Sequence, residues 1–259
     1  MDFLLPQNIM AFWLVVARIG GIVMSAPVLS SPNLPRQVKI AFALTLGVLI
    51  FPQVNIPNTF SFSNHWIIYI LFLIKEVGLG LILGYAIRLL FVGVELAGQI
   101  IGLQMGLSMA EFIDPESSEQ VPVISQFKNL LALMVFIGIN AHYAFLKATV
   151  DSFKLVPLGS FIISPPFVKT VVKMTGDVFV LALKAGTPII LTLLIIQIIM
   201  GVINRIIPQI NIFMISLPLK IGVGLVVIGL SVPYLVHFLE GTFGGIYRSL
   251  ILLLRIGAG

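Results

Sequence analysis

Long apolar runs with few charged residues constrain this chain more than any other feature of its sequence. Hydrophobic side chains make up 59% of the 259 residues and charged side chains only 10%, whereas an average soluble domain has roughly a quarter of its residues charged. Too few polar side chains are available to cover a water-soluble surface. Most of the chain must therefore face lipid or other apolar protein, and the sequence predicts an all-α membrane-type protein.

The apolar runs predict about six to eight hydrophobic helices arranged as kinked hairpins. We expect the first two helices over residues 9–29 and 40–51, on either side of a turn at Pro32 and Pro35. The run 66–110 is too long for one bilayer crossing and contains several charges, so it predicts two helices or a bent hairpin. Three further runs each have about the length of one membrane span, which needs about 20 residues: 130–146, 185–204 and 221–239.

Three polar stretches separate these runs and predict loops at residues 52–65, 111–119 and 151–177. The tail 241–259 carries Arg248 and Arg255 among leucines and predicts a short amphipathic helix. No stretch reads as a boundary between soluble domains. We expect one domain over 1–259, with N-terminal hairpins in 9–110 and C-terminal hairpins in 123–240.

The first residues do not predict a cleaved signal peptide. Basic residues are missing from the start of the chain, and Arg18 interrupts the first apolar run. The motif Ser25-Ala26-Pro27 is a poor cleavage site. We expect the N-terminus to be retained.

Basic residues in the expected loops give no consistent membrane orientation. If six simple spans are threaded, Arg36 and Lys39 fall on the side opposite to Lys154, Lys169 and Lys173. This conflict indicates that some helices do not cross the bilayer. Such helices would meet other subunits instead of lipid.

Several function classes are excluded or disfavoured by residue content. The net charge is +5, but Lys and Arg are scattered singly and form no basic patch, so nucleic acid is not an expected partner. No cysteine is present, which excludes disulfides, thiolate metal sites and cysteine nucleophiles. His65, His142 and His237 are far apart, and no HExxH, G-x-S-x-G or P-loop motif occurs. The sequence predicts no enzyme, no metal and no cofactor.

Glycines at every fourth position mark one helix face. Gly98, Gly102 and Gly106 follow this spacing, which allows another backbone to approach closely. The pattern predicts a helix-packing surface. It leaves open whether the surface packs within the chain or against a neighbouring subunit.

Isolated charges within apolar helices predict partners for those charges. Arg88, Glu95 and Gln99 share a helix face at spacings of seven and four. A proton or ion relay is one interpretation, but a structural pair or a contact with another subunit is favoured. We count Arg88, Glu95 and Lys220 as candidate buried charges. Pro188, Pro218 and Pro233 are expected to kink the helices that contain them.

The stretch 109–122, MAEFIDPESSEQVP, interrupts the apolar chain with four carboxylates and two prolines. Such a segment cannot face lipid, because its backbone and charges would lack partners there. Next to a glycine-rich helix end it predicts a pore-lining or pore-closing element. A plain solvated turn is the alternative.

The order of motifs resembles the FliR proteins of the flagellar type III export apparatus, from about Phe12 to Leu239. The first block contains Arg18, Gly20, Gly21, Ala26-Pro27 and the turn from Pro35 to Lys39. The most specific block contains Glu95-Leu96-Ala97-Gly98, Gln104-Met105-Gly106, Asp114-Pro115 and Gln120-Val121-Pro122-Val123. The third contains Pro208-Gln209, Asn211, Phe213, Pro218 and Lys220. The Asp114-Pro115 pair favours the flagellar branch over injectisome homologues.

This resemblance implies a non-enzymatic export-gate subunit in the bacterial inner membrane, within the flagellar basal body. One such chain would join several FliP-like and FliQ-like subunits in a helical, hetero-oligomeric, closed channel. An FlhB-like export switch protein, membrane lipid and unfolded flagellar proteins are its expected further partners. Energy for export would come from elsewhere in the apparatus.

The resemblance also places a pore plug at residues 106–122. Phe112 and Ile113 would close the constriction, and Gly106 would give the backbone freedom at one end. The remaining residues of the expected plug loop are carboxylates, serines and prolines: Glu111, Asp114, Pro115, Glu116, Ser117, Ser118, Glu119 and Pro122.

Two other function classes compete with this interpretation. A secondary transporter would use Arg88, Glu95 and Lys184 as coupling charges, but it should show an internal repeat with paired broken helices, and we find no convincing repeat. An intramembrane hydrolase would need a polar dyad at one membrane depth. No residue of the sequence is indicated as its nucleophile.

Overall fold

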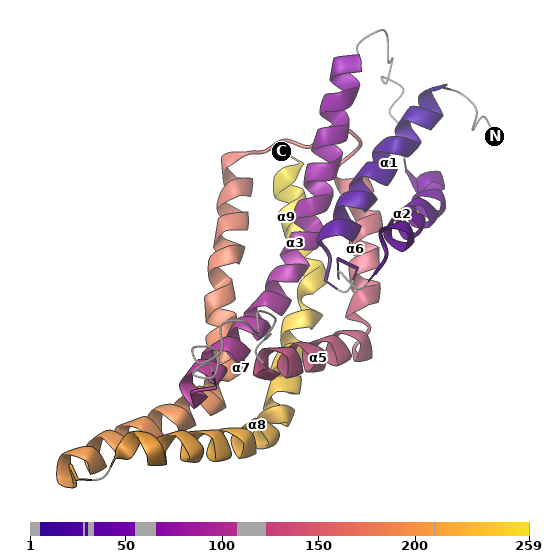
Figure 1. Ribbon diagram of the computed structural model, residues 1–259. Helices are drawn as coiled ribbons and strands as arrows, with labels where there is room; N and C mark the ends of the chain where they lie inside the picture. The colour runs from indigo at the N-terminus through magenta and orange to yellow at the C-terminus, as the bar shows by residue number, and fades with distance from the viewer. Residues whose placement is uncertain are drawn as a thin grey trace. The chain divides into compact units, whose positions relative to one another are not determined.

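The computed structural model describes residues 6–27, 29–30, 34–54, 66–107, 123–209 and 211–258, and these form helices and no strand (Figure 1). The predicted all-α fold is confirmed. The helices, with the 3₁₀ turn η1 among them, are α1 (Pro6–Ser25), α2 (Arg36–Ile50), η1 (Phe51–Gln53), α3 (Trp66–Met105), α5 (Val123–Gly138), α6 (Ala141–Leu155), α7 (Pro165–Ile206), α8 (Ile212–Gly244) and α9 (Ile246–Gly257).

The chain forms two compact units, each assembled from separated stretches of sequence. The first unit consists of residues 1–89, 140–175 and 245–259, and the second of residues 90–139 and 176–244. The long helices α3 and α7 therefore contribute one part to each unit. The assignment of the whole chain to one functional domain stays a prediction.

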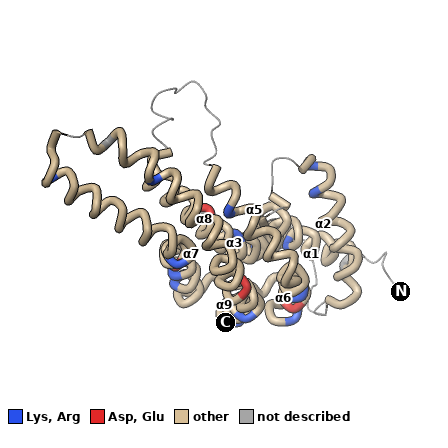
Figure 2. The backbone as a smooth tube through the Cα atoms, turned by 90° about the horizontal axis from the view of Figure 1, so that it is seen from below, with Lys and Arg blue, Asp and Glu red and all other residues tan. Residues whose placement is uncertain are grey.

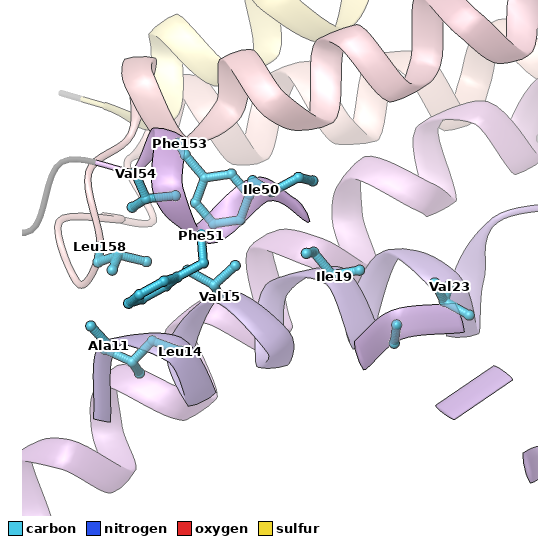
Figure 3. Packing of buried hydrophobic residues seen from close by; sticks show 11 residues of the cluster. Ala11, Leu14, Val15, Ile19, Val23, Ile50, Phe51, Val54, Phe153 and Leu158 are labelled. Atoms are coloured by element: carbon cyan, nitrogen blue, oxygen red, sulfur yellow. The ribbon is translucent and has the colours of Figure 1, made fainter. Parts of the chain in front are cut away.

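The core of the first unit forms where α1 packs beside α2 and the loop after α6 (Figure 3). Ala11, Leu14, Val15 and Ile19 recur at spacings of three and four, so they form one apolar stripe along α1. Phe51, at the start of η1, packs against this stripe. The first two helices thus follow the sequence prediction closely.

Two helices of the first unit touch backbone to backbone. A Cβ atom on Gly80 of α3 would collide with the carbonyl of Arg18, and one on Gly21 of α1 would collide with the carbonyl of Val77. Only residues without a side chain permit this approach. The close contact brings the side chains of α1 and α3 into reach of each other.

A fully buried ion pair lies at this contact. The guanidinium of Arg18 and the carboxylate of Glu76 are both 0% exposed, and Arg18 Nε donates to Glu76 Oε2 at 2.5 Å. Arg18 also donates to the carbonyl oxygens of Ser152, at 2.9 Å, and Val156, at 3.0 Å. Glu76 Oε1 accepts from the backbone N–H of Gly159 at 2.8 Å. This Arg18 network links α1, α3 and the end of α6.

The amphipathic C-terminal helix is confirmed as α9, which packs against α6 in the first unit. Its apolar face buries Leu250, Leu253 and Leu254, while Arg248 and Arg255 are exposed. Tyr247 donates a hydrogen bond from its hydroxyl to Asp151 Oδ2 of α6 at 2.8 Å. The tail is therefore fixed to the first unit by both apolar and polar contacts.

The second unit contains an aromatic trio. Phe91 of α3, Phe136 of α5 and Phe243 of α8 place their ring centroids 5.3 to 5.5 Å apart. Rings at these distances attract each other beyond the burial of their apolar area. The trio joins three helices that are far apart in sequence.

The prediction of two helices or a bent hairpin over 66–110 is wrong, because α3 is a single helix of 40 residues. The charges that suggested a break do not interrupt it. Glu76 turns inward to Arg18, whereas Lys75 and Arg88 are exposed on the helix surface. A charge that finds a partner or a free surface leaves the helical backbone intact.

The run 130–146, expected to have the length of one span, is not one continuous helix, because α5 ends at Gly138 and α6 begins at Ala141. Asn140 adopts a left-handed conformation with φ of 57° at this break. Asparagine tolerates this conformation better than most residues. The break therefore lies at a polar residue whose type accommodates it.

The expected loop 151–177 is much shorter than predicted. Helix α6 continues to Leu155, and α7 begins at Pro165. Two prolines, Pro165 and Pro166, open α7, where the missing N–H groups cost nothing. The loop was predicted from its charged residues alone, and several of these residues belong to α6 and α7.

Four helical stretches are long and apolar enough to cross a membrane, or five if the bent pair α5 and α6 counts as one. They comprise α1, α3, α7 and the stretch Met214–Gly257. The expected spans 185–204 and 221–239 lie inside the longer helices α7 and α8. Charged residues are few along these helices (Figure 2).

We predict that Arg18→Ala strongly destabilises the protein. Removing one partner of a buried ion pair leaves the other charge uncompensated and costs about 3–5 kcal/mol. Thermal or denaturant unfolding of the detergent-solubilised chain measures this. Lys154→Ala is the control, because Lys154 is 62% exposed in its pair with Asp151 and should contribute nothing measurable. Equal stability of the two variants would contradict a structural role for the Arg18 network.

Candidate functional site

The end of α3 has a well-defined C-cap at Gly106. Gly106 has φ of +82°, its N–H donates to the carbonyl of Leu103, and the N–H of Leu107 donates to the carbonyl of Gly102. This pair of bonds is the Schellman motif, in which a left-handed glycine ends the helix. We expected backbone freedom at Gly106, and the left-handed conformation of Gly106 agrees with that expectation.

The C-cap and the start of α5 rest on one apolar cluster in the second unit. Ile101 and Met105 of α3 pack there with Ile124 of α5. Ile189 and Leu193 of α7 complete the buried layer, together with Ile228 of α8. Met105 and Ile124, which lie on either side of residues 108–122 in the sequence, therefore pack in the same cluster.

Most of the expected plug lies outside the described residues. Only Gly106 belongs to the part of the chain that the structure describes. The remaining expected plug residues, outside the described ranges, are Glu111, Phe112, Ile113, Asp114, Pro115, Glu116, Ser117, Ser118, Glu119 and Pro122. The plug assignment stays a prediction.

The three glycines of the predicted packing face have different surroundings. A Cβ on Gly98 would collide with the backbone of Ser125 in α5, whereas a Cβ on Gly102 would meet nothing within 4 Å. A Cβ on Gly106 would collide with the side chain of Leu217 in α8. Ser125 also donates from its hydroxyl to the carbonyl of Glu95 at 3.1 Å. Gly98 thus serves packing within the chain, while Gly102 is buried but leaves room for a methyl group.

A proline notch in α7 is capped by side chains from two other helices. Pro188 lacks the N–H that would bond to the carbonyl of Lys184 four residues earlier. Tyr234 of α8 donates its hydroxyl to that carbonyl at 2.9 Å, and Lys128 of α5 donates to the neighbouring carbonyl of Ala185 at 3.0 Å. The side chain of Lys128 is only 2% exposed. The notch therefore fixes α5 and α8 against α7.

The candidate buried charges are only partly covered by the chain itself. Arg88 is exposed and Glu95 is half-buried, and neither forms an ion pair within the described residues. Lys220 is half-buried and donates to Gln197 Oε1 at 3.2 Å. Their burial in a larger assembly stays a prediction.

Sequence reasoning missed the charges that are buried among the described residues, which are Arg18, Glu76 and Lys128. Arg18 is an isolated charge inside an apolar run and Glu76 interrupts another beside Lys75, so this signal was visible in the sequence. Their partners were not, because Arg18 and Glu76 are 58 positions apart and Lys128 bonds to a backbone carbonyl. Among the described residues, no group of His, Cys, Asp and Glu is arranged to hold a metal ion.

Comparison with known proteins decides the family. The family model for bacterial export proteins, family 1, matches residues 9–246. The flagellar biosynthetic protein FliR of Escherichia coli (strain K12) is 32% identical over 241 residues, covering 92% of this chain and 90% of the relative. The chain belongs to the FliR family. FliR of Bacillus subtilis (strain 168) is 31% identical and covers 84% of each chain, and FliR of Aquifex aeolicus (strain VF5) is 30% identical over 233 residues.

Membership of the FliR family makes this chain a membrane-embedded component of flagellar protein export. The resemblance inferred from the motifs is confirmed. Several residues of those motifs have structural tasks here. Arg18 forms the buried ion pair, Gly98 admits α5, and Gly106 ends α3. Part of the FliR motif pattern therefore specifies the fold of a single chain.

We predict opposite effects for two alanine substitutions on the glycine face of α3. Gly98→Ala should destabilise the isolated chain by about 1–3 kcal/mol, because the new methyl group overpacks the contact with Ser125. Gly102→Ala is the matched control and should stabilise it by up to about 1 kcal/mol, since alanine favours a helix and the site leaves room for a methyl group. Unfolding in detergent measures both changes. Equal effects would contradict the packing assigned to Gly98.

Proposed function

We propose that this FliR-family chain is a non-enzymatic subunit of the flagellar type III export gate. Together with FliP-like and FliQ-like subunits it forms a closed channel for unfolded flagellar proteins. The channel belongs to the basal body and lies at the bacterial inner membrane, next to an FlhB-like export switch protein. The fold, the exposed surface and the ends of the plug segment each support this proposal.

The observation that carries the proposal is the length of the apolar helices. Helices α3 and α7 contain 40 and 42 residues. At 1.5 Å per residue each measures about 60 Å, which is about twice the thickness of a hydrocarbon core. Lipid can cover only part of such helices. The remaining apolar surface needs other protein, which is what a multisubunit gate supplies.

Large apolar side chains are exposed along α7 and α8, in support of this argument. Ile206 is 71% exposed, Met214 73% and Leu230 76%. Many large apolar side chains exposed on the same helices indicate contact with protein or membrane. A subunit packed between similar hairpins would bury these residues.

The residues that flank the expected plug support this role. Met105 and Ile124 pack in one apolar cluster, and Gly106 ends α3 with a left-handed backbone conformation. We propose that the plug residues between these fixed points are displaced by a passing polypeptide and return. In this role Phe112 and Ile113 block ions and water, and the carboxylates Glu111, Asp114, Glu116 and Glu119 keep the rest of the segment out of lipid.

We predict that this chain forms a stable hetero-oligomer with FliP-like and FliQ-like subunits. Co-expression, purification through a tag on this chain alone and native mass spectrometry measure its composition. The expected complex contains one copy of this chain and several copies of each companion, since the exposed apolar faces of α7 and α8 require partners. A monomer or homo-oligomer that retains neither companion would contradict the proposed gate.

We further predict that Phe112→Ala combined with Ile113→Ala makes the assembled gate leak. Smaller side chains no longer fill the constriction, so small ions pass. Membrane potential or solute leakage in cells that produce the complete complex measures the effect. Ser117→Ala combined with Ser118→Ala is the control in the same segment and should leave the leak unchanged. Normal assembly without increased leakage in the first variant would rule out the plug assignment.

A further inference from the structure

A polar hollow lies between the C-terminal half of α7 and the N-terminal half of α8, within the second unit. These halves run side by side as a hairpin (Figures 1 and 2). The hollow has a volume of about 450 Å³, and its polar lining consists of Gln197, Asn204, Asn211, Ser216 and Lys220. We call it the amide hollow. Lys220 donates across it to Gln197 Oε1 at 3.2 Å.

The surface around the amide hollow is apolar. Ile198 and Val202 of α7 are 58% and 53% exposed, and Ile215 of α8 is 52% exposed. A surface of this kind is covered by lipid or by protein, so the hollow loses its contact with bulk water when the hairpin is covered. A counter-charge stabilises a lysine in such surroundings.

The hairpin itself supplies no counter-charge. Between residues 178 and 239 the chain contains no aspartate and no glutamate, although it contains Lys184, Arg205 and Lys220. The acceptor that the structure gives Lys220 is a neutral amide oxygen. An ammonium group has three N–H donors, so it can bind a further acceptor. The missing anion must come from outside the hairpin.

We propose that the amide hollow binds an aspartate or glutamate side chain from a neighbouring subunit of the gate. Lys220 compensates the charge of that carboxylate. The side-chain amides of Gln197, Asn204 and Asn211 offer N–H donors to its oxygen atoms. This inference rests on the proposed gate function, and it names the chemistry by which the hairpin recognises its neighbour.

The position of Lys220 along α8 favours a protein carboxylate over a lipid headgroup. Lys220 lies eight residues beyond the start of α8 at Ile212, which is about 12 Å along the helix axis. If the hairpin turn lies at the membrane surface, Lys220 is near the middle of a hydrocarbon core about 30 Å thick. A phosphate group does not reach that depth, whereas a side chain on a neighbouring helix does.

Such a contact also fixes how far two subunits slide along each other. Apolar helix faces alone pack in several registers with similar energy. A single buried polar pair penalises every register in which it is broken, as buried polar residues do in coiled coils. The carboxylate and Lys220 therefore align the neighbouring helix with this hairpin.

The test uses the complete complex, purified through a tag on this chain and analysed by native mass spectrometry. Lys220→Glu should reduce the retained companion subunits at least about tenfold, since truncating or reversing one partner of a buried charge pair weakens binding strongly. Lys220→Gln should reduce retention less. Lys184→Glu is the matched control, because Lys184 is an exposed cation of α7 that lies outside the amide hollow, and this variant should keep its companions.

A reciprocal substitution identifies the carboxylate. Each aspartate and glutamate of the companions is changed to lysine, one at a time, in combination with Lys220→Glu. Restored retention with one such change supports the proposal. Normal retention in both Lys220 variants overturns it, as does the absence of any restoring change. Loss of a bound phospholipid from Lys220→Gln with full retention of companions would assign the hollow to a headgroup instead.

Two measurements separate this inference from other failures. Unfolding of the isolated Lys220→Glu chain in detergent should match the unchanged chain, because the hollow is open in the single subunit. If this variant is unstable, Lys220→Gln carries the test. A wild-type chain that retains no companion would contradict the proposed function itself, whereas an effect confined to Lys220 concerns only the amide hollow.

Discussion

The buried ion pair between Arg18 and Glu76 is the interaction on which the first unit depends. The pair lies where α1, α3 and the end of α6 meet. Arg18 binds Glu76 and two backbone carbonyls, and Glu76 also accepts a hydrogen bond from the N–H of Gly159. Apolar surfaces alone would allow α1 to slide along α3. A buried charge permits only the arrangement in which it is satisfied, because any other leaves it unpaired at a cost of several kcal/mol.

The same requirement explains the polar contacts of the second unit. Pro188 exposes a carbonyl in α7, and Tyr234 satisfies it from another helix. Lys128 is almost completely buried, yet it finds the carbonyl of Ala185. In a chain with so few polar groups, these contacts fix the helices that carry them. Lys220 differs, since it is only half-buried and lies on a hairpin with an exposed apolar surface, and this position directs the search for a further partner to other subunits.

The sequence predicted most of the helices but not the polar contacts between them. Apolar runs located α1 and α2, and arginines among leucines indicated the amphipathic α9, because these signals are local in the sequence. It misjudged α3, since a charge such as Glu76 reads as an interruption until its partner Arg18 is known. It missed the break at Asn140 for the opposite reason: one polar residue in an apolar run gives no local sign of a left-handed turn. The site followed the same division, with Gly106 foreseen as a backbone feature and Lys128 overlooked.

Polar groups that are fully satisfied inside the chain and polar groups that are not have different tasks. Arg18, Glu76 and Lys128 are satisfied in the isolated fold, so they determine how one subunit folds. Arg88 and Lys220 remain at least partly exposed on apolar helices, where neither lipid nor the chain compensates a charge. If these helices contacted only lipid, apolar residues at these positions would make the protein more stable. Their presence is consistent with a surface that is completed only when the gate assembles.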